Sequence, residues 1–198
     1  MIRMRLREVM GSNTLAGKSA GLRDFPKLMA AVQRTPDGST IVLDWSDVEI
    51  ASASYLGSTL MVLLRMAISG DLNRYFILTG MNGCCFDELG LVLELQGHAV
   101  LVGEIGRGGR VQGVQLVGKV DPSHASTFAE VVKSGALTAS QLHERSGSLG
   151  LAKIGKTGWI NRLNALHNER LLRRARVGRE FVFHVPEKEL TDGSGLDS

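Results

Sequence analysis

Cysteine is scarce in this sequence, and long hydrophobic runs are missing. The 198 residues include two cysteines, the adjacent pair Cys84 and Cys85. Adjacent cysteines rarely form a disulfide because the ring is strained, so a disulfide framework is excluded and a reducing, cytoplasmic compartment is expected. No apolar stretch approaches the roughly 18–20 residues that cross a bilayer, so we expect no membrane partner. The first residues alternate apolar and charged side chains, which predicts a strand rather than a signal peptide.

Signatures of catalysis and metal binding are also lacking. The five histidines are scattered, with no His-Glu-x-x-His motif and no cluster with cysteine. Asp44, Asp47 and Glu49 follow a predicted strand, but no base or metal ligand accompanies them, so we interpret them as a solvated acidic turn. The sequence therefore predicts no catalysed reaction, no metal and no cofactor.

One glycine-containing segment, Gly11–Ser19, keeps a nucleotide hydrolase open as an alternative. It precedes a predicted helix and ends in Gly-Lys-Ser, as a phosphate-binding loop does. Five residues separate Gly11 from Gly17, where that motif has four. The hydrolase alternative therefore rests on Gly17, Lys18 and Ser19 alone.

The small net charge of +3 hides an uneven distribution of charged residues. Residues 1–100 hold 9 basic and 10 acidic side chains, whereas residues 101–198 hold 14 basic and 10 acidic ones. From Arg145 to Arg179 there are nine basic residues and one acid, Glu169, which gives a balance of +8. Such a block predicts a polyanionic partner, most often nucleic acid, with a solvated protein face as the alternative.

Strand and helix patterns alternate through the first 120 residues. Short apolar runs bounded by turns are typical of strands buried on both faces, and apolar residues at helical spacing predict helices between them. This rhythm predicts an α/β sandwich with a mixed sheet in residues 1–120. The expected strands are 2–9, 40–44, 75–79, 98–105 and 111–120, and the expected helices are one that reaches Val32, then 54–69 and 86–95.

The segment Ile41–Gly57 carries a resemblance to a known family. Its sequence, Ile-Val-Leu-Asp-Trp-Ser-Asp-Val-Glu-Ile-Ala-Ser-Ala-Ser-Tyr-Leu-Gly, resembles STAS domains such as the anti-sigma-factor antagonists, and more closely the STAS-like domains of unknown function. The resemblance implies a domain that receives a signal or binds a partner protein. It also makes Ser54 a candidate phosphoacceptor. Ser52, Ala53 and Tyr55 depart from the antagonist pattern, which favours a plain N-cap role for Ser54.

After residue 120 the pattern changes to three helices and a hairpin. We expect helices at 123–134 and Ala139–Arg145, the latter capped by Thr138, and a third helix capped by Thr157. A hairpin centred on Gly178 follows. This order predicts a small α+β winged helix-turn-helix domain over residues 121–186, and residues 187–198 are expected to form a flexible tail.

The third helix and the hairpin contain the expected DNA contacts. The segment from Thr157 to Arg174 resembles the recognition helix and wing start of bacterial winged-helix regulators. Trp159, Leu163 and Leu166 are expected to pack inward, which leaves Arg and Asn side chains for base edges and phosphates. The predicted DNA-binding residues are Lys156, Thr157, Asn161, Arg162, Asn164, Arg173, Arg174, Arg176 and Arg179.

Two hypotheses of function follow from these features. The first is a non-enzymatic regulatory protein whose winged helix binds double-stranded DNA, as a homodimer on paired half-sites, while the STAS-like domain receives a signal. The second is a partner-switching adaptor whose winged helix mediates protein contacts or dimerisation, and it draws on the acidic turn Asp44–Glu49.

Overall fold

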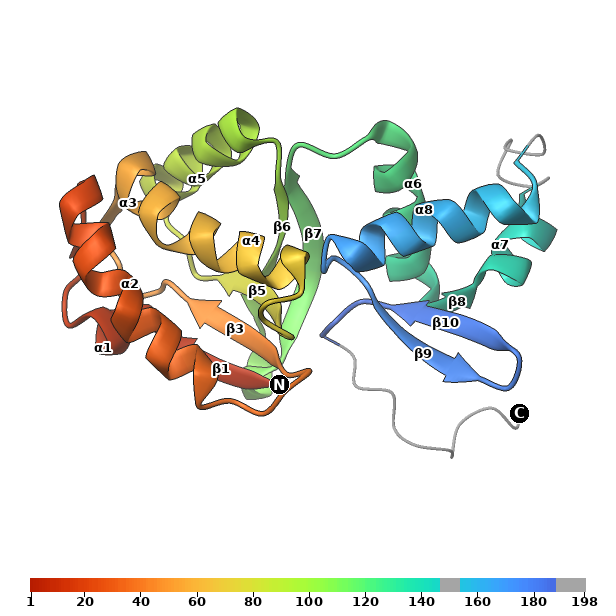
Figure 1. Cartoon of the computed structure of the whole chain (residues 1–198), viewed down its shortest axis with the longest axis horizontal. Coiled ribbons are helices and arrows are strands. Elements are labelled where there is room, and N and C mark those ends of the chain that lie inside the picture. Colours follow the sequence, from red (N-terminus) through yellow and green to blue (C-terminus); the bar gives the residue numbers. More distant parts are fainter. Residues whose placement is uncertain (147–153, 188–198) are drawn as a thin grey trace.

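A central β-sheet is the frame on which the rest of the chain is built. The computed structural model describes residues 1–146 and 154–187. In Figure 1 the helices of the first hundred residues lie on one side of this sheet, and the C-terminal elements lie on the other. Within the described residues, no helix is both long and apolar enough to cross a membrane.

The sheet has five strands in the order β1-β3-β5-β6-β7. The first four run parallel, and β7 runs antiparallel to β6 across the turn Arg107–Gly109. Every residue of β3 and β5 is buried, as their unbroken apolar sequences predicted. The expectation of an α/β fold with a mixed sheet is confirmed. The strands are β1 (Ile2–Arg5), β3 (Thr40–Asp44), β5 (Tyr75–Thr79), β6 (Ala99–Ile105) and β7 (Val111–Gly118).

Four helices cover the first face of the sheet. Strand residues such as Ile41 and Leu43 point toward this face and share one apolar core with Leu56, Leu63 and Leu89 of the helices. The alternation of side chains along a strand explains why neighbouring residues enter different cores. The covering helices are α2 (Lys18–Gln33), α3 (Ala53–Ser58), α4 (Leu60–Ser69) and α5 (Gly83–Gln96).

Two of the expected elements differ from the structure. The predicted strand 2–9 ends at Arg5, and a short helix α1 (Leu6–Met10) follows. Leu6 and Met10 are both buried, and their spacing of four places them on one helix face, so core packing overrides the alternating pattern. The predicted helix 54–69 is broken at Thr59, which has φ −126° and ψ −82°.

The C-terminal elements match the predicted order, with one addition. The helices are α6 (Pro122–Ser134), α7 (Ala139–Arg145) and α8 (Lys156–Asn168), and the strands are β8 (Ala136–Thr138), β9 (Arg173–Val177) and β10 (Glu180–His184). Strand β8 was not predicted, and it completes an antiparallel sheet of order β8-β10-β9. Gly178 turns the β9–β10 hairpin with φ +60°.

Of the two N-caps predicted for the C-terminal helices, the structure confirms one. Thr138 caps α7, and its hydroxyl accepts the Gln141 N–H while the Gln141 side chain accepts the Thr138 N–H. The prediction of Thr157 as a cap is wrong, because α8 begins at Lys156 with Gly155 as its N-cap, two residues earlier than expected. The predicted tail lies outside the described residues from residue 188 onward.

The C-terminal elements complete a second apolar core on the opposite face of the sheet. Ile77, Leu101 and Val114 of the sheet join this core, together with Trp159 and Phe183 of the C-terminal elements. Both predicted domains therefore contribute side chains to this second core. The predicted domain boundary near residue 120 lies within a packed unit.

Candidate nucleic-acid interface

Helix α8 buries one face and exposes the other, as its spacing predicted. Trp159, Leu163 and Leu166 are at most 1 % exposed and form the packed face. On a helix of 3.6 residues per turn, Thr157 and Asn161 lie on the side away from these residues, and both are exposed. The outward side of α8 therefore presents hydroxyl and amide groups that can donate and accept hydrogen bonds.

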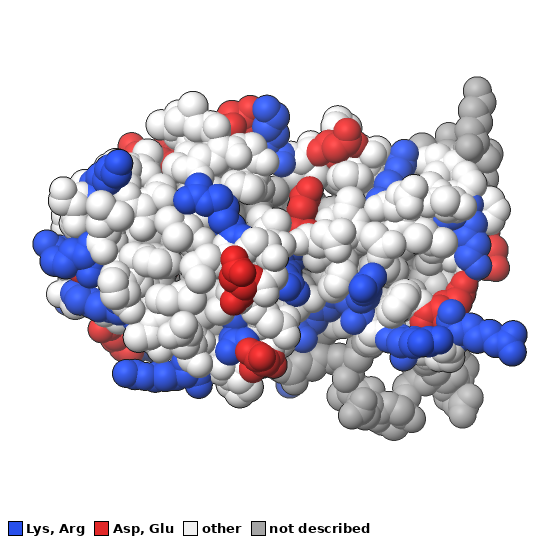
Figure 2. Space-filling view, viewed as in Figure 1, with Lys and Arg blue, Asp and Glu red and all other residues white. Residues whose placement is uncertain are grey.

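The β9–β10 hairpin is fixed against α8 through Arg174. Its Nη1 donates to Oδ1 of Asn164 over 3.1 Å, and its guanidinium lies 4.7 Å from the centre of the Phe181 ring. Arg176 is directly opposite Phe181 in the strand register, so it lies on the same face of the hairpin. Arg176 and Arg179 are exposed. Figure 2 shows basic side chains spread over α8 and this hairpin, at the right of the view.

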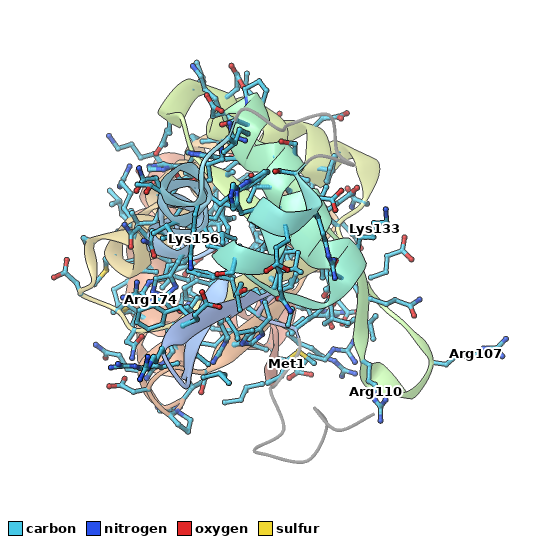
Figure 3. All side chains as sticks on the ribbon, turned by 90° about the vertical axis from the view of Figure 1, so that its right-hand side faces the viewer. Met1, Arg107, Arg110, Lys133, Lys156 and Arg174 are labelled. Carbon is cyan, nitrogen blue, oxygen red and sulfur yellow. The ribbon has the colours of Figure 1, made fainter. Side chains whose placement is uncertain are left out.

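The start of α8 is tied to the hairpin by an ion pair. Nζ of Lys156 lies 3.0 Å from Oε1 of Glu180, which also accepts the Ser140 hydroxyl. Hydrogen bonds from Ser140 and Lys156 lower the pKa of Glu180. The carboxylate therefore offsets the positive charge of Lys156, and it links α7, α8 and β10. Figure 3 shows Lys156 and Arg174 on the same side of the molecule.

Two of the predicted contacts lie apart from this surface. The guanidinium of Arg162 lies 5.3 Å from the centre of the Trp159 ring, on the opposite flank of α8 from Lys156 and Asn164. Arg173 turns inward, where its Nη2 donates to the Gly38 carbonyl and to the Thr40 hydroxyl. The structure therefore does not bring Arg162 and Arg173 together with Arg174, Arg176 and Arg179.

Sequence reasoning missed the contacts of Tyr75 with Arg170 and Arg173, which join α8 and the hairpin to the sheet. We call this group of contacts the joint. Tyr75 at the amino end of β5 is 6 % exposed, and the guanidinium groups of Arg173 and Arg170 lie 4.5 and 5.4 Å from its ring centre. Arg170 has φ +61°, which is uncommon for a residue with a side chain, and its Nε donates to the Ala67 carbonyl over 2.8 Å. No local pattern reports contacts between residues so far apart in sequence.

His167 lies next to this joint and is half-buried. Burial lowers the pKa of His167, and the nearby charges of Arg174 and Arg170 lower it further, against the opposing effect of a hydrogen bond to the Leu172 carbonyl. The Nδ1–Leu172 oxygen distance is 3.0 Å, so Nδ1 donates in the neutral ring. The folded state therefore favours uncharged His167.

This pKa shift predicts a loss of stability in mild acid. Below about pH 6.5 the unfolded chain binds a proton at His167 while the folded chain does not, so the free energy of unfolding falls as the pH falls through this window. Urea unfolding between about pH 7.5 and 5.5 should show this dependence, and His167→Gln should flatten it. An NMR titration of the His167 ring with a midpoint at or above about 6.5 would contradict the prediction.

The serines at the start of α3 are arranged differently from the expectation. Ser52 is the N-cap, and its Oγ accepts the Tyr55 N–H, whereas Ser54 is exposed in the first turn. The N-cap role expected for Ser54 is therefore wrong. The N–H of Ala53 donates to Oε2 of Glu88 over 2.5 Å, so a carboxylate already lies at this helix terminus.

The expected acidic turn is also only partly solvated. Asp44 is 2 % exposed and accepts hydrogen bonds from Arg3 and from the backbone and hydroxyl of Ser46. Burial raises the pKa of Asp44, but these hydrogen bonds and the Arg3 charge outweigh it and hold the pKa below its usual value. Asp47 and Glu49 are exposed, as expected. Asp44 therefore has a structural role.

The segment Gly11–Ser19 does not form a phosphate cradle. It follows α1 rather than a strand, and its centre, β2 (Thr14–Leu15), pairs with β4 (Ile50–Ala51). The Gly17 N–H, which would face a phosphate, donates to Oγ of Ser52 over 3.0 Å. Among the described residues, no three His, Cys, Asp or Glu side chains gather in a way that could hold a metal ion.

The chain matches no protein-family model, no curated protein and no solved structure. The resemblances to STAS-like and winged-helix domains therefore stay predictions.

Proposed function

We propose that this chain is a non-enzymatic, DNA-binding regulatory protein of the cytoplasm. In this proposal residues 121–186 act as a winged helix-turn-helix, and α8 enters the major groove. The order α6-β8-α7-α8-β9-β10, with a sheet of order β8-β10-β9, supports it, because three helices with a short strand after the first and a hairpin after the third make up that domain.

The observation that carries the proposal is the contact of Arg174 with Asn164. It places a hairpin with three exposed arginines beside the outward face of α8, so one surface offers Asn161 and Thr157 to base edges. Arg174, Arg176 and Arg179 would then contact the phosphate backbone that flanks the groove.

The α/β part would receive the signal or bind the partner protein. Its STAS-like segment and the exposed Ser54 are the candidate sites for a partner protein or a phosphate, and the joint at Tyr75 connects β5 to the start of the hairpin. Two copies would bind paired half-sites, since twofold operators match twofold proteins.

A second candidate function is the partner-switching adaptor. Ile160 on α8 is 37 % exposed, and Val177 and Phe181 on the hairpin are 46 and 44 % exposed. Exposed apolar and aromatic side chains near Arg are typical of protein interfaces. Under this alternative the same surface docks a protein, and duplex DNA does not bind.

Fluorescence anisotropy with a labelled duplex of mixed sequence tests the proposal. We expect a non-specific Kd of about 10⁻⁴–10⁻⁶ M near physiological salt. With the three hairpin arginines at the backbone, log K should fall against log salt with a slope of about −3. Absence of binding at low salt, or an affinity that does not change with salt concentration, would overturn the proposal and favour the adaptor function.

A further inference from the structure

The three-stranded sheet β8-β10-β9 has a second face, opposite the one that packs against α8. Arg174 is directly opposite Phe183 in the strand register, and on their side of the sheet Phe183 enters the second core while Arg174 reaches Asn164. Side chains alternate along a strand, so the neighbouring pair, Arg173 and His184, points to the other face. Arg173 and His184 therefore belong to a surface that is separate from the outward side of α8.

A cavity of about 480 Å³ lies at this second face. The hairpin lines it through Arg173 and His184, and the α/β half lines it through Gly38, Thr40 and Tyr75, at the amino ends of β3 and β5. In Figure 1 the start of β3 lies next to the β9–β10 hairpin. Ligand pockets of proteins measure about 300–1,000 Å³, so this cavity has room for a small molecule.

Hydrogen bonds join the two sides of the cavity. Nη2 of Arg173 donates to the Gly38 carbonyl and to the Thr40 hydroxyl, and the Thr40 hydroxyl donates to the Pro186 carbonyl over 2.8 Å. The Arg173 guanidinium also lies 4.5 Å from the centre of the Tyr75 ring. These contacts orient the guanidinium before any ligand binds.

The charged groups of the lining favour an anion. A guanidinium has a planar set of N–H donors that matches the oxygens of carboxylate and phosphate groups. Within the described residues, Asp37 is the one acid in the lining, and it accepts a hydrogen bond from the buried Arg74. A cation would be repelled by Arg173, and an apolar molecule would leave the polar groups of the lining unpaired.

Tyr75 adds a hydroxyl to the cavity. Tyr75 is buried and lines the cavity, yet its hydroxyl makes no hydrogen bond within residues 1–146 and 154–187. The hydroxyl of a buried tyrosine usually has a hydrogen-bond partner. An oxygen atom of a ligand would supply that partner here.

We propose that this cavity is a binding site for a small molecule that carries a carboxylate or phosphate group. The Arg173 guanidinium and the Tyr75 hydroxyl donate hydrogen bonds to that group, and the buried His184 ring lines the same space. No DNA contact takes part, so the site does not depend on the proposed function.

Fluorine NMR of the full chain labelled with fluorotyrosine tests this proposal, because the chain has two tyrosines. Tyr75 lines the cavity, whereas Tyr55 is buried in the first core and serves as an internal reference. The chain is titrated with inorganic phosphate and, separately, with malonate at constant ionic strength. At least one ion should shift the Tyr75 signal saturably, with a Kd of about 1–10 mM because so small an ion makes few contacts, and leave the Tyr55 signal unchanged. No saturable Tyr75 shift with either ion, or an equal movement of the Tyr55 signal, overturns the proposal.

Tyr75→Phe tests the hydroxyl, since it keeps the aromatic ring beside Arg173. The amide signals of Gly38 and Thr40, which line the same cavity, report binding in this variant. The Kd should rise by about 3–10-fold, as expected for the loss of one hydrogen bond. Tyr55→Phe is the matched control and should bind like the wild type. Equal affinities of Tyr75→Phe and the wild type overturn the proposed site.

Arg173→Gln tests the guanidinium and should weaken binding by more than about 10-fold, because hydrogen bonds to charged groups are the stronger ones. Arg7→Gln removes the same charge at an exposed position of α1 and should leave the Kd unchanged. Far-UV circular dichroism establishes that each variant is folded, and Tyr75→Phe keeps the proposal testable where Arg173→Gln does not fold. A folded Arg173→Gln variant that binds as tightly as Arg7→Gln overturns the proposal.

Discussion

Replacing Arg174, Arg176 and Arg179 together with alanine should lower the affinity for duplex DNA by about 10²–10³-fold at about 0.1 M salt. The three side chains lie on one hairpin that Arg174 joins to α8. Each phosphate contact releases about 0.9 counterion, so the variant should also reduce the magnitude of the salt slope by about 3. Anisotropy titrations at several salt concentrations measure both quantities.

The control is a variant that removes three positive charges elsewhere. Arg7, Lys18 and Arg34 are exposed on α1, at the start of α2 and just after α2. Their replacement by alanine changes the net charge by the same amount, and binding should stay within about threefold of wild type, because distant exposed charges are largely screened. Equal losses in the two triple variants would show that net charge, and not the hairpin, governs affinity.

Leu101→Ala should destabilise both halves of the chain together. Leu101 is 1 % exposed on β6, and its side chain packs in the core that contains Trp159 and Phe183. Removing a buried leucine side chain costs about 2–5 kcal/mol. If the two halves were independent domains, the C-terminal helices would keep their stability.

The two tryptophans allow this prediction to be read from each core separately. Trp45 lies in the core on the first face of the sheet, and Trp159 lies in the core on the second. In Trp159→Phe, where Trp45 alone reports, and in Trp45→Phe, where Trp159 alone reports, urea unfolding followed by fluorescence should coincide with unfolding followed by far-UV circular dichroism. Leu101→Ala should shift the transition in both variants. Fluorescence and circular-dichroism midpoints that differ within one variant, or a shift seen by one tryptophan alone, would contradict a shared unit.

Much of the local structure could be predicted because local signals agree with the fold. Strands β3 and β5 begin and end where their apolar runs do, since both faces of these strands are covered and every side chain is buried. Helix α7 begins at Thr138 because its hydroxyl and the Gln141 side chain satisfy each other's backbone groups.

The predictions of local structure fail where contacts between residues remote in sequence determine that structure. Alternating arginines predicted a strand over residues 2–9, but burial of Leu6 and Met10 in the core makes the second half helical. Ser52 rather than Ser54 caps α3, and its hydroxyl also accepts the N–H of Gly17, a residue that is remote in sequence.

The candidate site could be predicted only in part, for a similar reason. Composition identified the basic segment, and helical spacing identified the packed face of α8. Neither can tell that Arg173 turns inward to Thr40 while its neighbour Arg174 turns outward to Asn164. That difference depends on which face of the hairpin meets the sheet, as does the contact of Arg170 with Tyr75.

The sheet that is covered on both faces also sets an order of events during synthesis. Its five strands are complete once residue 118 has left the ribosome, but Ile77, Leu101 and Val114 stay exposed until the chain beyond residue 121 has been made. A nascent chain at that stage displays an apolar surface of the kind that chaperones bind. The N-terminal half therefore passes through a partly folded intermediate with an exposed apolar surface whenever translation pauses between residue 118 and the C-terminal helices.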